Sequence, residues 1–385
     1  MINSQKLVAA GPTLEAGRRY RVLTVKNAAG ARLFTAAAES VYRGDPNWVP
    51  PLPGEESETF APRRNPVLAN MAARRWVLLK RDAPCGRVAA FAPAHRPGVG
   101  YMGFFESPND VHAAHLLLDA AEEWLCAHGR RECYGPIAVT PRDRIGLLVD
   151  GFERPPMLFT PYNPPYYEAL LQARGWTPHR SLRAYGWNDG YQDPRSVLPL
   201  AERATAGSPV RIRPLRMDRL TQETRLIARL INQTLAEAWH FDPISEREAA
   251  ALASLLRPIL DPTIALVAED EGGPCAVALG VPDVNWLWRR AEARLWPMGW
   301  ARLLRWRRHI PQVRVMALGL ERRVQRTGLA ARMITQLHRA GRARGYVQGE
   351  LSQVYDENLG MGRILDRMRF PVVRRYAVLA RQVDG

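Results

Sequence analysis

Lysine, cysteine and long apolar runs are scarce in this chain of 385 residues. The four cysteines, Cys85, Cys126, Cys133 and Cys275, form no CxxC pair, which argues against a disulfide framework or a cysteine-rich zinc site and predicts reduced thiols. The eight histidines form no HExxH motif, so we expect no metal. No stretch approaches about 18 consecutive apolar residues, which excludes a membrane-spanning helix. The N-terminus makes a poor signal peptide, and we expect a cytoplasmic protein.

Positive charge, in contrast, is abundant. Lys+Arg 54 against Asp+Glu 38 gives a net charge of +16, and only Lys6, Lys26 and Lys80 are lysines. An excess of this size predicts an anionic partner, which is a phosphorylated cofactor, an acidic carrier protein, a nucleic acid or an anionic membrane surface. The composition, 46% hydrophobic and 24% charged, is that of a globular protein, and the length favours two domains.

The same order of predicted elements occurs twice along the chain. In each half two strands around a tight turn and a third strand precede a long helix, and a strand, a short helix opening with Asn163 or Asn358, and a closing strand follow. This order predicts an internal duplication. Its predicted parts are an N-terminal arm over 1–34, a domain over 35–187, a linker over 188–208, and a domain over 209–385 with a Trp- and Arg-rich insertion over 284–311.

The junction between a strand and a helix in the second half is the most informative segment. The predicted strand 313–320 runs into residues 321–330, ERRVQRTGLA, where the helix begins. Gly328 lets the backbone approach a ligand closely, and the free N–H groups and dipole of a helix start favour an anion. Arg322, Arg323 and Arg326 add positive charge. The spacing fits neither a Walker loop nor a three-glycine dinucleotide fingerprint, and it predicts a diphosphate cradle.

The spacing Gln325-x-x-Gly328-x-Ala330 resembles the Q/R-x-x-G-x-G/A loop of the GNAT acyltransferase superfamily, whose backbone amides grip the diphosphate of coenzyme A. Downstream, Asn358 to Phe370 is similar to the family pattern N-x(6)-Y-x-x-x-G-F. The first half, with ESPNDV before its helix, resembles a degenerate GNAT half without the glycine pair. From about residue 35 to 381 the chain resembles bacterial tandem-GNAT proteins in the stretches DPNWVPPL, GLLVDGF and PYNPPYY.

The resemblance implies an α/β (α+β) fold of two tandem GNAT-like domains, each a mixed, mostly antiparallel twisted sheet flanked by helices. The implied donor is acetyl-CoA or a longer acyl-CoA. Its pantetheine arm would add to strand 313–320 where this strand diverges from strand 346–354. The residues implied in its binding are Leu320, Arg322, Val324, Gln325, Arg326, Thr327, Gly328, Leu329, Ala330 and Asn358.

The catalytic groups match the family pattern less well. Leu365 stands where many family members carry a general-acid tyrosine, so Tyr376, which lies nearby in the sequence, is our candidate for that role. A carboxylate is needed to take a proton from the attacking nitrogen, and the candidates are Glu350, beside the divergence, and Glu321, at the end of the neighbouring strand. Asn358 either holds a cofactor amide or caps its helix. For the acceptor pocket, the Pro-rich loop 155–167 offers Tyr162, Asn163 and Tyr166.

These features predict an N-acyltransferase that moves an acetyl or longer acyl group from CoA to the amine of a small molecule by direct attack on the thioester. Two alternatives stay open: an aminoacyl-tRNA- or acyl-carrier-protein-dependent transferase of the same fold, and a non-catalytic CoA-binding module, which Leu365 favours. A nucleic-acid partner is disfavoured, because the diphosphate loop argues for CoA. The insertion fits a covering layer, a lid over a long acyl chain, a docking face for an acidic acyl carrier protein or an interfacial membrane patch.

Overall fold

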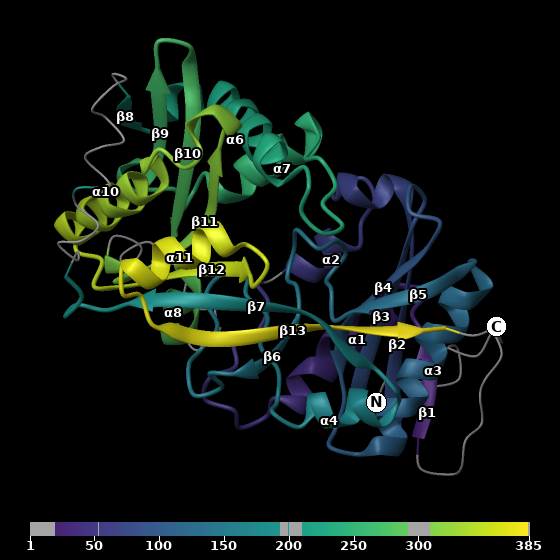
Figure 1. The fold of residues 1–385 in the computed structure, drawn as a ribbon. Helices are drawn as coiled ribbons and strands as arrows, with labels where there is room; N and C mark the ends of the chain where they lie inside the picture. Colours follow the sequence, from purple (N-terminus) through teal and green to yellow (C-terminus); the bar gives the residue numbers. More distant parts are fainter. Residues whose placement is uncertain (1–19, 53, 193–198, 200–209, 292–308, 384–385) are drawn as a thin grey trace.

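The computed structural model describes residues 20–192 other than residue 53, residue 199, and residues 210–291 and 309–383. We call residues 20–187 the first half and residues 210–383 the second half. One continuous sheet of 13 strands passes through both halves, with helices on each of its faces (Figure 1).

Within the described residues the elements follow a similar order in both halves, except that one strand of the first half (Leu147–Asp150) and one helix of the second half (Val284–Arg290) have no counterpart. The first half contains β1 (Tyr20–Thr24), α1 (Ala28–Val41), α2 (Glu55–Thr59), η2 (Pro66–Asn70), β2 (Met71–Lys80), β3 (Ala83–Pro93), β4 (Gly98–Glu106), α3 (Val111–Ala127), β5 (Arg130–Gly135), β6 (Leu147–Asp150), α4 (Tyr167–Ala173) and β7 (Thr177–Trp187). The second half contains β8 (Arg211–Pro214), η3 (Met217–Arg219), α6 (Leu220–Leu235), α7 (Glu246–Leu256), η4 (Pro262–Ile264), β9 (Ala265–Asp270), β10 (Gly273–Pro282), α8 (Val284–Arg290), β11 (Gln312–Leu320), η6 (Arg322–Val324), α10 (Leu329–Arg344), β12 (Gln348–Tyr355), α11 (Leu359–Arg367) and β13 (Val372–Gln382).

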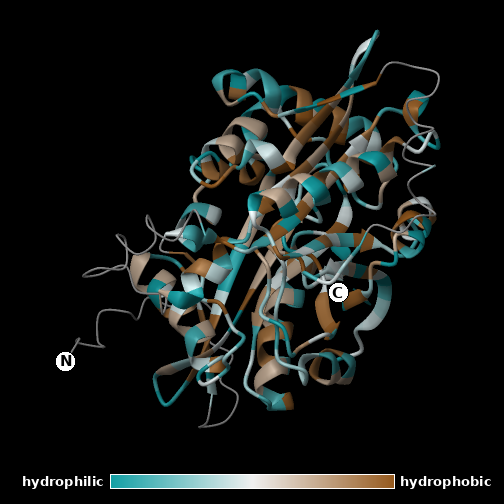
Figure 2. Cartoon of the chain, turned by 90° about the vertical axis from the view of Figure 1, so that its left-hand side faces the viewer, coloured by the Kyte–Doolittle hydropathy of each residue, from teal (hydrophilic) through white to brown (hydrophobic). Residues whose placement is uncertain are grey.

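Side chains alternate between the two faces of the sheet, so each half has three layers. On β3, Val88 packs on the face of α3 and Ala89 on the face of α1. On β10, Ala276 faces α10 and α11, whereas Val277 faces α6 and α7. Figure 2 shows the consequence as hydrophobic strands enclosed by helices whose outer surfaces are hydrophilic.

The two halves exchange their closing strands. The sheet order is β1-β2-β3-β4-β5-β13-β7-β12-β11-β10-β9-β8, so β13, the last strand of the chain, lies between β5 and β7 of the first half. In return, β7 pairs with β12 of the second half. The sequence predicts both closing strands and a sheet in each domain, but periodicity identifies a strand without naming its partner. The halves therefore share one sheet and are joined by main-chain hydrogen bonds.

Part of the predicted N-terminal arm is ordered structure. Residues 20–24 form β1, which pairs with β2, and Asn27 caps α1 by accepting from the Gly30 N–H at 2.9 Å. Phe34 of this helix is fully buried. The expected arm over 1–34 is thus wrong for residues 20–34, because β1 is too short and α1 too rich in alanine to show a clear period.

Several predicted features lie outside the described residues. These are residues 1–19, most of the linker 188–208, and residues 292–308 of the Trp- and Arg-rich insertion. Among the helices that the structure describes, none has the length and apolar character needed to cross a membrane.

Candidate active site

Two parallel strands of the second half diverge halfway along their length. β11 and β12 pair from Gln312–Gln348 to Val315–Leu351, after which β11 continues to Leu320 without a described strand beside it on that edge. The pairing of β11 with β10 is irregular at Met316, which marks a bulge at the point of divergence. The edge over residues 316–320 can therefore accept an extended ligand as an additional strand.

The turn after β11 leads to a helix start without a side-chain cap. Gly328 is the N-cap of α10, in the left-handed region at φ +92°, and it has no side chain that could accept from the helix amides. Within the described part of the chain, the backbone N–H groups of Arg326, Thr327, Gly328 and Ala330 donate to no protein acceptor. Free N–H groups and the helix dipole favour an anion at this turn.

Buried side chains and internal hydrogen bonds fix the shape of this turn. Val324 and Leu329 pack in the core beside α10, so only their main-chain atoms can contact a ligand. The Gln325 side chain donates to the Leu320 carbonyl at 3.1 Å, and the Thr327 hydroxyl donates to the Val324 carbonyl at 2.7 Å. The turn is thus preorganised with its amides exposed.

The charges on the turn are largely neutralised. Arg323 pairs with Asp270 and with Glu321, and its hydrogen bonds to Asp270 hold the pKa of that carboxyl below its usual range. Arg322 pairs with Glu237. Of the three arginines predicted to favour a diphosphate, Arg326 alone has no ion-pair partner in the described structure, and it is exposed. An anion at this turn would therefore meet free amides and, among the described residues, one unpaired cation, Arg326.

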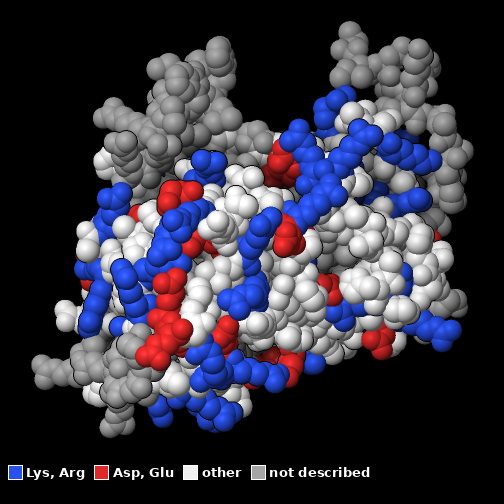
Figure 3. Space-filling model, turned by 90° about the horizontal axis from the view of Figure 1, so that it is seen from above, with Lys and Arg blue, Asp and Glu red and all other residues white. Residues whose placement is uncertain are grey.

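This pairing fits the wider distribution of charge. The face seen in Figure 3 carries more basic than acidic side chains, with acidic groups interspersed among them. On this face (Figure 3) the basic side chains are thus spread among acidic ones and are not gathered in one patch.

The family position for a general acid is part of the core. Leu365 on α11 is fully buried among the residues that pack against α10. Asn358 caps α11 by accepting from the Met361 N–H at 3.1 Å, so the structure gives this side chain the capping role. No acidic hydrogen is available at residue 365.

A buried cluster of charges lies at the closed end of the divergence. Glu350 and Arg374, which are 2% and 3% exposed, form an ion pair. Arg314, next to Glu350 in the register of β11 and β12, donates from Nε to the Ser352 hydroxyl at 3.1 Å. Charges this deep are stable only when paired and hydrogen-bonded, and the cluster largely meets that condition.

A segment of the first half closes over this cluster. Asp283 accepts from the Leu158 N–H at 2.8 Å, and Arg314 donates to the Leu158 carbonyl. Arg374 donates to the Pro155 carbonyl. Burial raises the pKa of Asp283 to about 7. The second half thus holds the main chain of residues 155–158 in place through three buried side chains.

Two buried polar atoms beside this segment have no partner. Glu350 Oε1 and the Tyr376 hydroxyl form no hydrogen bond within the described structure. Burial and the nearby Glu350 charge raise the pKa of Tyr376 far above its ordinary value, so this phenol keeps its proton. Unsatisfied buried polar atoms are uncommon, and here they mark a place for a polar ligand or water. The structure places Glu350 and Tyr376 in one cluster. Glu321 lies at the far end of β11, bound to Arg229 and Arg323.

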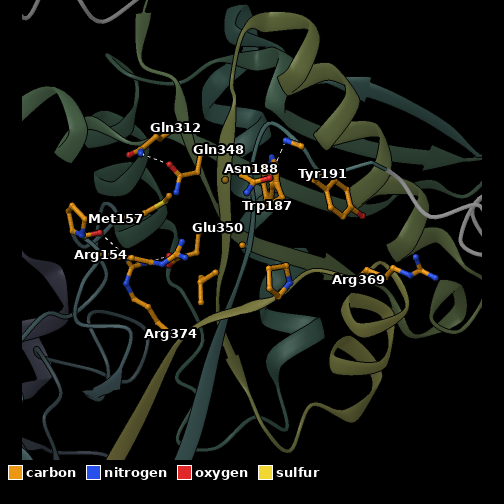
Figure 4. A pocket seen from close by; sticks show the side chains of 16 residues that line it. Arg154, Met157, Trp187, Asn188, Tyr191, Gln312, Gln348, Glu350, Arg369 and Arg374 are labelled. Atoms are coloured by element: carbon orange, nitrogen blue, oxygen red, sulfur yellow. Dashed lines mark hydrogen bonds and ion pairs between the residues drawn. The ribbon is translucent and has the colours of Figure 1, made fainter.

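A cavity of about 360 Å³ adjoins the Glu350–Arg374 pair (Figure 4). Both halves line it: Met157 and Trp187 come from the first, and Gln312, Gln348 and Glu350 from the second. The Gln312 side chain donates to the Gln348 side chain at 2.7 Å on its wall. The cavity gives a small molecule access to the pair of carboxylate and guanidinium.

The predicted acceptor residues do not reach this cavity. Tyr162 donates to Asp45, Asn163 hydrogen-bonds both main-chain groups of Leu148, and Tyr166 donates to the Ser107 carbonyl. All three thus bond within the first half. The loop does reach the second half, but through residues 155–158. Sequence reasoning missed Arg314, Arg374 and Asp283, and the only available signal was an arginine within each of two apolar strands.

The chain is similar to two curated proteins along nearly its whole length. It is 27% identical over 370 residues to a bacterial ceramide synthase from Caulobacter vibrioides, covering 93% of this chain and 96% of that protein. It is 28% identical over 376 residues to protein YghO from Escherichia coli, covering 94% and 95%. No family model matches the chain.

Solved structures share its architecture. A tandem GNAT protein from the clavulanic acid biosynthesis pathway matches with a TM-score of 0.57 and 11% identity, covering 95% of this chain and 99% of that one. A GCN5-related glucosamine N-acetyltransferase region of a fungal multi-domain β-N-acetylglucosaminidase gives a TM-score of 0.60 and 14% identity, covering 95% and 38%. The predicted fold is confirmed: the chain has the tandem GNAT fold, a large, mostly antiparallel sheet flanked by helices.

Proposed function

We propose that the chain is an acyl-CoA-dependent N-acyltransferase whose active site belongs to the second half. The observation that carries this proposal is the continuity between the unpaired edge of β11 over 316–320 and the free amides of residues 326–330. An extended pantetheine arm suits the first, and a diphosphate suits the second. The donor's acyl end would then lie at the divergence, beside the buried cluster.

The donor contacts follow from this placement. The turn from Arg322 to Ala330 would contact the donor through main-chain groups, with Arg326 adding its free charge. The N–H and the carbonyl of Leu320, in contrast, already hydrogen-bond the Thr234 hydroxyl. The paired Arg322 would contribute less than Arg326, because Glu237 already neutralises it. Asn358 would act indirectly, by fixing the start of α11.

Glu350 and Tyr376 are the groups that we assign to proton transfer. Glu350 Oε1 would accept the proton that the attacking nitrogen loses as it bonds to the acyl carbon, and Arg374 would hold this carboxylate in place. Tyr376, which keeps its proton, would donate to the departing thiolate. Both atoms lack a partner in the described structure, which leaves them free for these roles.

The acceptor class is suggested by the Caulobacter relative. A ceramide is the amide of a fatty acid with a long-chain amino alcohol, so we propose a long-chain acyl-CoA as donor and a long-chain amino alcohol as acceptor. The cavity lined by Met157, Trp187 and Glu350 combines apolar and polar walls, as an amino alcohol requires. The insertion over 284–311 is a candidate lid for the acyl chain or a docking surface for a carrier protein.

The test is a transfer assay with purified full-length protein. Acetyl-CoA and palmitoyl-CoA are each incubated with sphinganine or ethanolamine, and the free thiol and the mass of the amide are measured. We expect palmitoyl-CoA with sphinganine to give amide, and Glu350→Gln to lower kcat about 100-fold with unchanged CoA affinity. The matched control Glu246→Gln, at an exposed site on α7, should retain full activity. Failure to bind either CoA ester would overturn the proposal.

Leu365 supports a second candidate, a CoA-binding module without catalytic activity. The residue at the family position of the general-acid tyrosine is a fully buried leucine, which has no proton to donate. The same assay separates the two candidates. Tight CoA binding with no thiol release from any ester and amine pair would favour the binding module.

A further inference from the structure

The first half contains a second cavity, of about 140 Å³, where its own parallel strands diverge. β4 and β5 pair only as far as Tyr101–Tyr134, which matches the divergence of β11 and β12. Three separate segments supply aromatic walls: Tyr42 and Trp48 precede β2, Phe104 lies near the end of β4, and Tyr162 follows β6. Tyr42 and Trp48 stack with ring centroids 5.0 Å apart. This cavity is therefore a preformed aromatic pocket.

The start of α3, which corresponds to the start of α10 in the second half, is occupied by the chain's own groups. Asp110 caps α3 by accepting from the N–H groups of His112 and Ala113 at 3.0 and 3.2 Å. Tyr166 donates to the Ser107 carbonyl at 2.9 Å, and the Ser107 N–H donates to the Tyr167 hydroxyl at 2.9 Å. A carboxylate thus occupies the place of a diphosphate, so the cavity is not a second CoA site.

The floor of the cavity holds two carboxylates and one guanidinium. Arg87, 4% exposed, pairs with Glu56 at 2.6 Å, whereas Glu106 lies 3.6 Å from it and accepts from the Tyr167 hydroxyl at 2.8 Å. The other cations near Glu56 are Arg144, which pairs with Glu55, and Arg75, which stacks over Phe60 and does not line the cavity. The Arg144–Glu55 pair on the wall is neutral. Among the charged side chains that line the cavity, the carboxyl groups of Glu55, Glu56 and Glu106 therefore outnumber the guanidinium groups of Arg87 and Arg144 by one.

One buried donor on the floor also lacks a partner. Arg87 Nε makes no hydrogen bond within the described structure. A carboxylate with incomplete compensation and a free donor, enclosed by aromatic rings, suit an ammonium group next to a hydroxyl or other acceptor. Burial raises the pKa of Glu106, and a bound cation would lower it again.

The roof of the cavity is tied to the second half. Residues 48–52 cover it, and Trp288 of α8 donates to the Pro50 carbonyl at 3.1 Å. Leu158 and Thr160 form part of its wall, while Met157 of the same segment lines the larger cavity. The segment bound by Asp283 and Arg314 thus separates the two cavities.

We propose that this cavity of the first half is a binding site for the ammonium group of an alkylamine, with the ammonium beside Glu106 and the chain against Trp48 and the prolines that follow it. The site requires no CoA, so it stands whether or not the second half catalyses acyl transfer.

The test is calorimetric titration of the full-length protein with octylamine, octanol and octanoate in the absence of CoA. Octylamine should bind at least about tenfold more tightly than either analogue of equal length. Glu106→Gln should remove this binding event, since the amide still accepts from Tyr167 but carries no charge. Glu350→Gln should keep it, which separates this site from the cavity of the second half. The exposed Glu246→Gln is the control for a change of charge alone.

The number of protons released on binding is a second measurement, and a purely structural role of Glu106 would not produce such a release. Octylamine binding should release protons from Glu106, seen as a dependence of the binding heat on buffer ionisation enthalpy, and the release should vanish in Glu106→Gln. If Glu106→Gln fails to fold, Trp48→Leu, which removes a wall, should weaken octylamine about threefold. Equal binding of octylamine and octanoate, or octylamine binding that survives Glu106→Gln, would overturn the proposal.

Discussion

The two halves build the same junction of strand, turn and helix in opposite electrostatic states. In the first half the turn from β4 to α3 is short, and the Asp110 carboxylate accepts from the first amides of the helix. In the second half the turn from β11 to α10 is longer, and Gly328 leaves the corresponding amides free. The fold is thus common to both halves, but the N-cap carboxylate accepts from the helix start in the first half, and the N-cap Gly328 has no side chain to do so in the second.

The two pairs of diverging strands also differ in the residues at their last paired positions. The last two pairs of β4 and β5 are Gly100–Cys133 and Tyr101–Tyr134, and those of β11 and β12 are Arg314–Glu350 and Val315–Leu351. The first half therefore has glycine and a buried thiol where the second half has a guanidinium and a carboxylate. Burial raises the pKa of the Cys133 thiol well above its ordinary value, so it offers no charge. The candidate proton-transfer groups and the free amides thus occur together in the second half.

The largest expected effect comes from giving the second half the cap of the first. Gly328→Asp should weaken CoA binding at least about 100-fold, or about 2.7 kcal/mol, because a carboxylate would compete for the amides and repel the diphosphate. Gly328→Asn is the matched control, since asparagine has the same shape and tolerates a positive φ. Calorimetry with CoA should show a loss of only a few-fold for this variant. Equal losses in both variants would mean that backbone strain, not charge, closes the site.

A smaller effect should distinguish free from paired arginines on the open turn. Arg326→Ala should weaken CoA binding about tenfold at low salt, because Arg326 has no ion-pair partner in the described structure. Arg322→Ala should cost about twofold, since Glu237 already neutralises Arg322. Arg225→Ala on the exposed surface of α6 is the control. Calorimetry at low and high salt measures these differences, and a tenfold loss for both turn variants would refute the ranking.

The features of this comparison that depend on neighbouring residues can be predicted from the sequence. Periodicity predicts α10 over the residues that form it. The position before an apolar helical pattern indicates Asn109 or Asp110 as a cap, and the structure has Asp110. The free amides of the turn follow from Gly328 at a junction between strand and helix. These features depend on residues close together in the chain, so neighbouring residue types determine them.

The non-local part could not be predicted. The exchange of β7 and β13, the hold of Asp283 and Arg314 on Leu158, and the pairing of Glu350 with Arg374 all join residues far apart in the chain. The place of the Pro-rich loop is also non-local. The hydroxyls of Tyr162 and Tyr166 bond to Asp45 and Ser107 within the first half, and Tyr162 lines the cavity of that half and not the cavity beside Glu350.

The contribution of the buried Asp283 contact between the halves to the free energy of unfolding should depend measurably on pH. Burial raises the pKa of Asp283 to about 7, whereas an aspartate in an unfolded chain has a pKa near about 4. Between these values the folded state binds more protons than the unfolded state, so the contribution of Asp283 to stability falls as pH rises from about 4 to 7 and is constant above. Asp283→Asn keeps an oxygen for the Leu158 N–H and removes this titration.

In urea unfolding, Asp283→Asn should therefore gain stability relative to the original protein by about 1 kcal/mol or more at pH 8.5, and less at pH 5. A difference between the two proteins that does not change with pH would show that Asp283 titrates normally. Thermal unfolding at both pH values should rank the stabilities of the two proteins in the same way, because the contact between the halves that Asp283 makes is lost on unfolding.

The smallest effect should come from removing the charge of the Asp110 cap in the first half. Asp110→Asn keeps a good N-cap but loses the interaction of a negative charge with the start of α3, and it weakens the hydrogen bond from Tyr20 at 2.9 Å. We expect a loss of about 0.5–1 kcal/mol in the free energy of unfolding, measured in urea at neutral pH. The variant should gain no CoA binding in calorimetry, because Tyr166 and Tyr167 still hold Ser107 across the path of a diphosphate. New CoA binding in Asp110→Asn would mean that the cap alone separates the halves and that these tyrosines do not close the site.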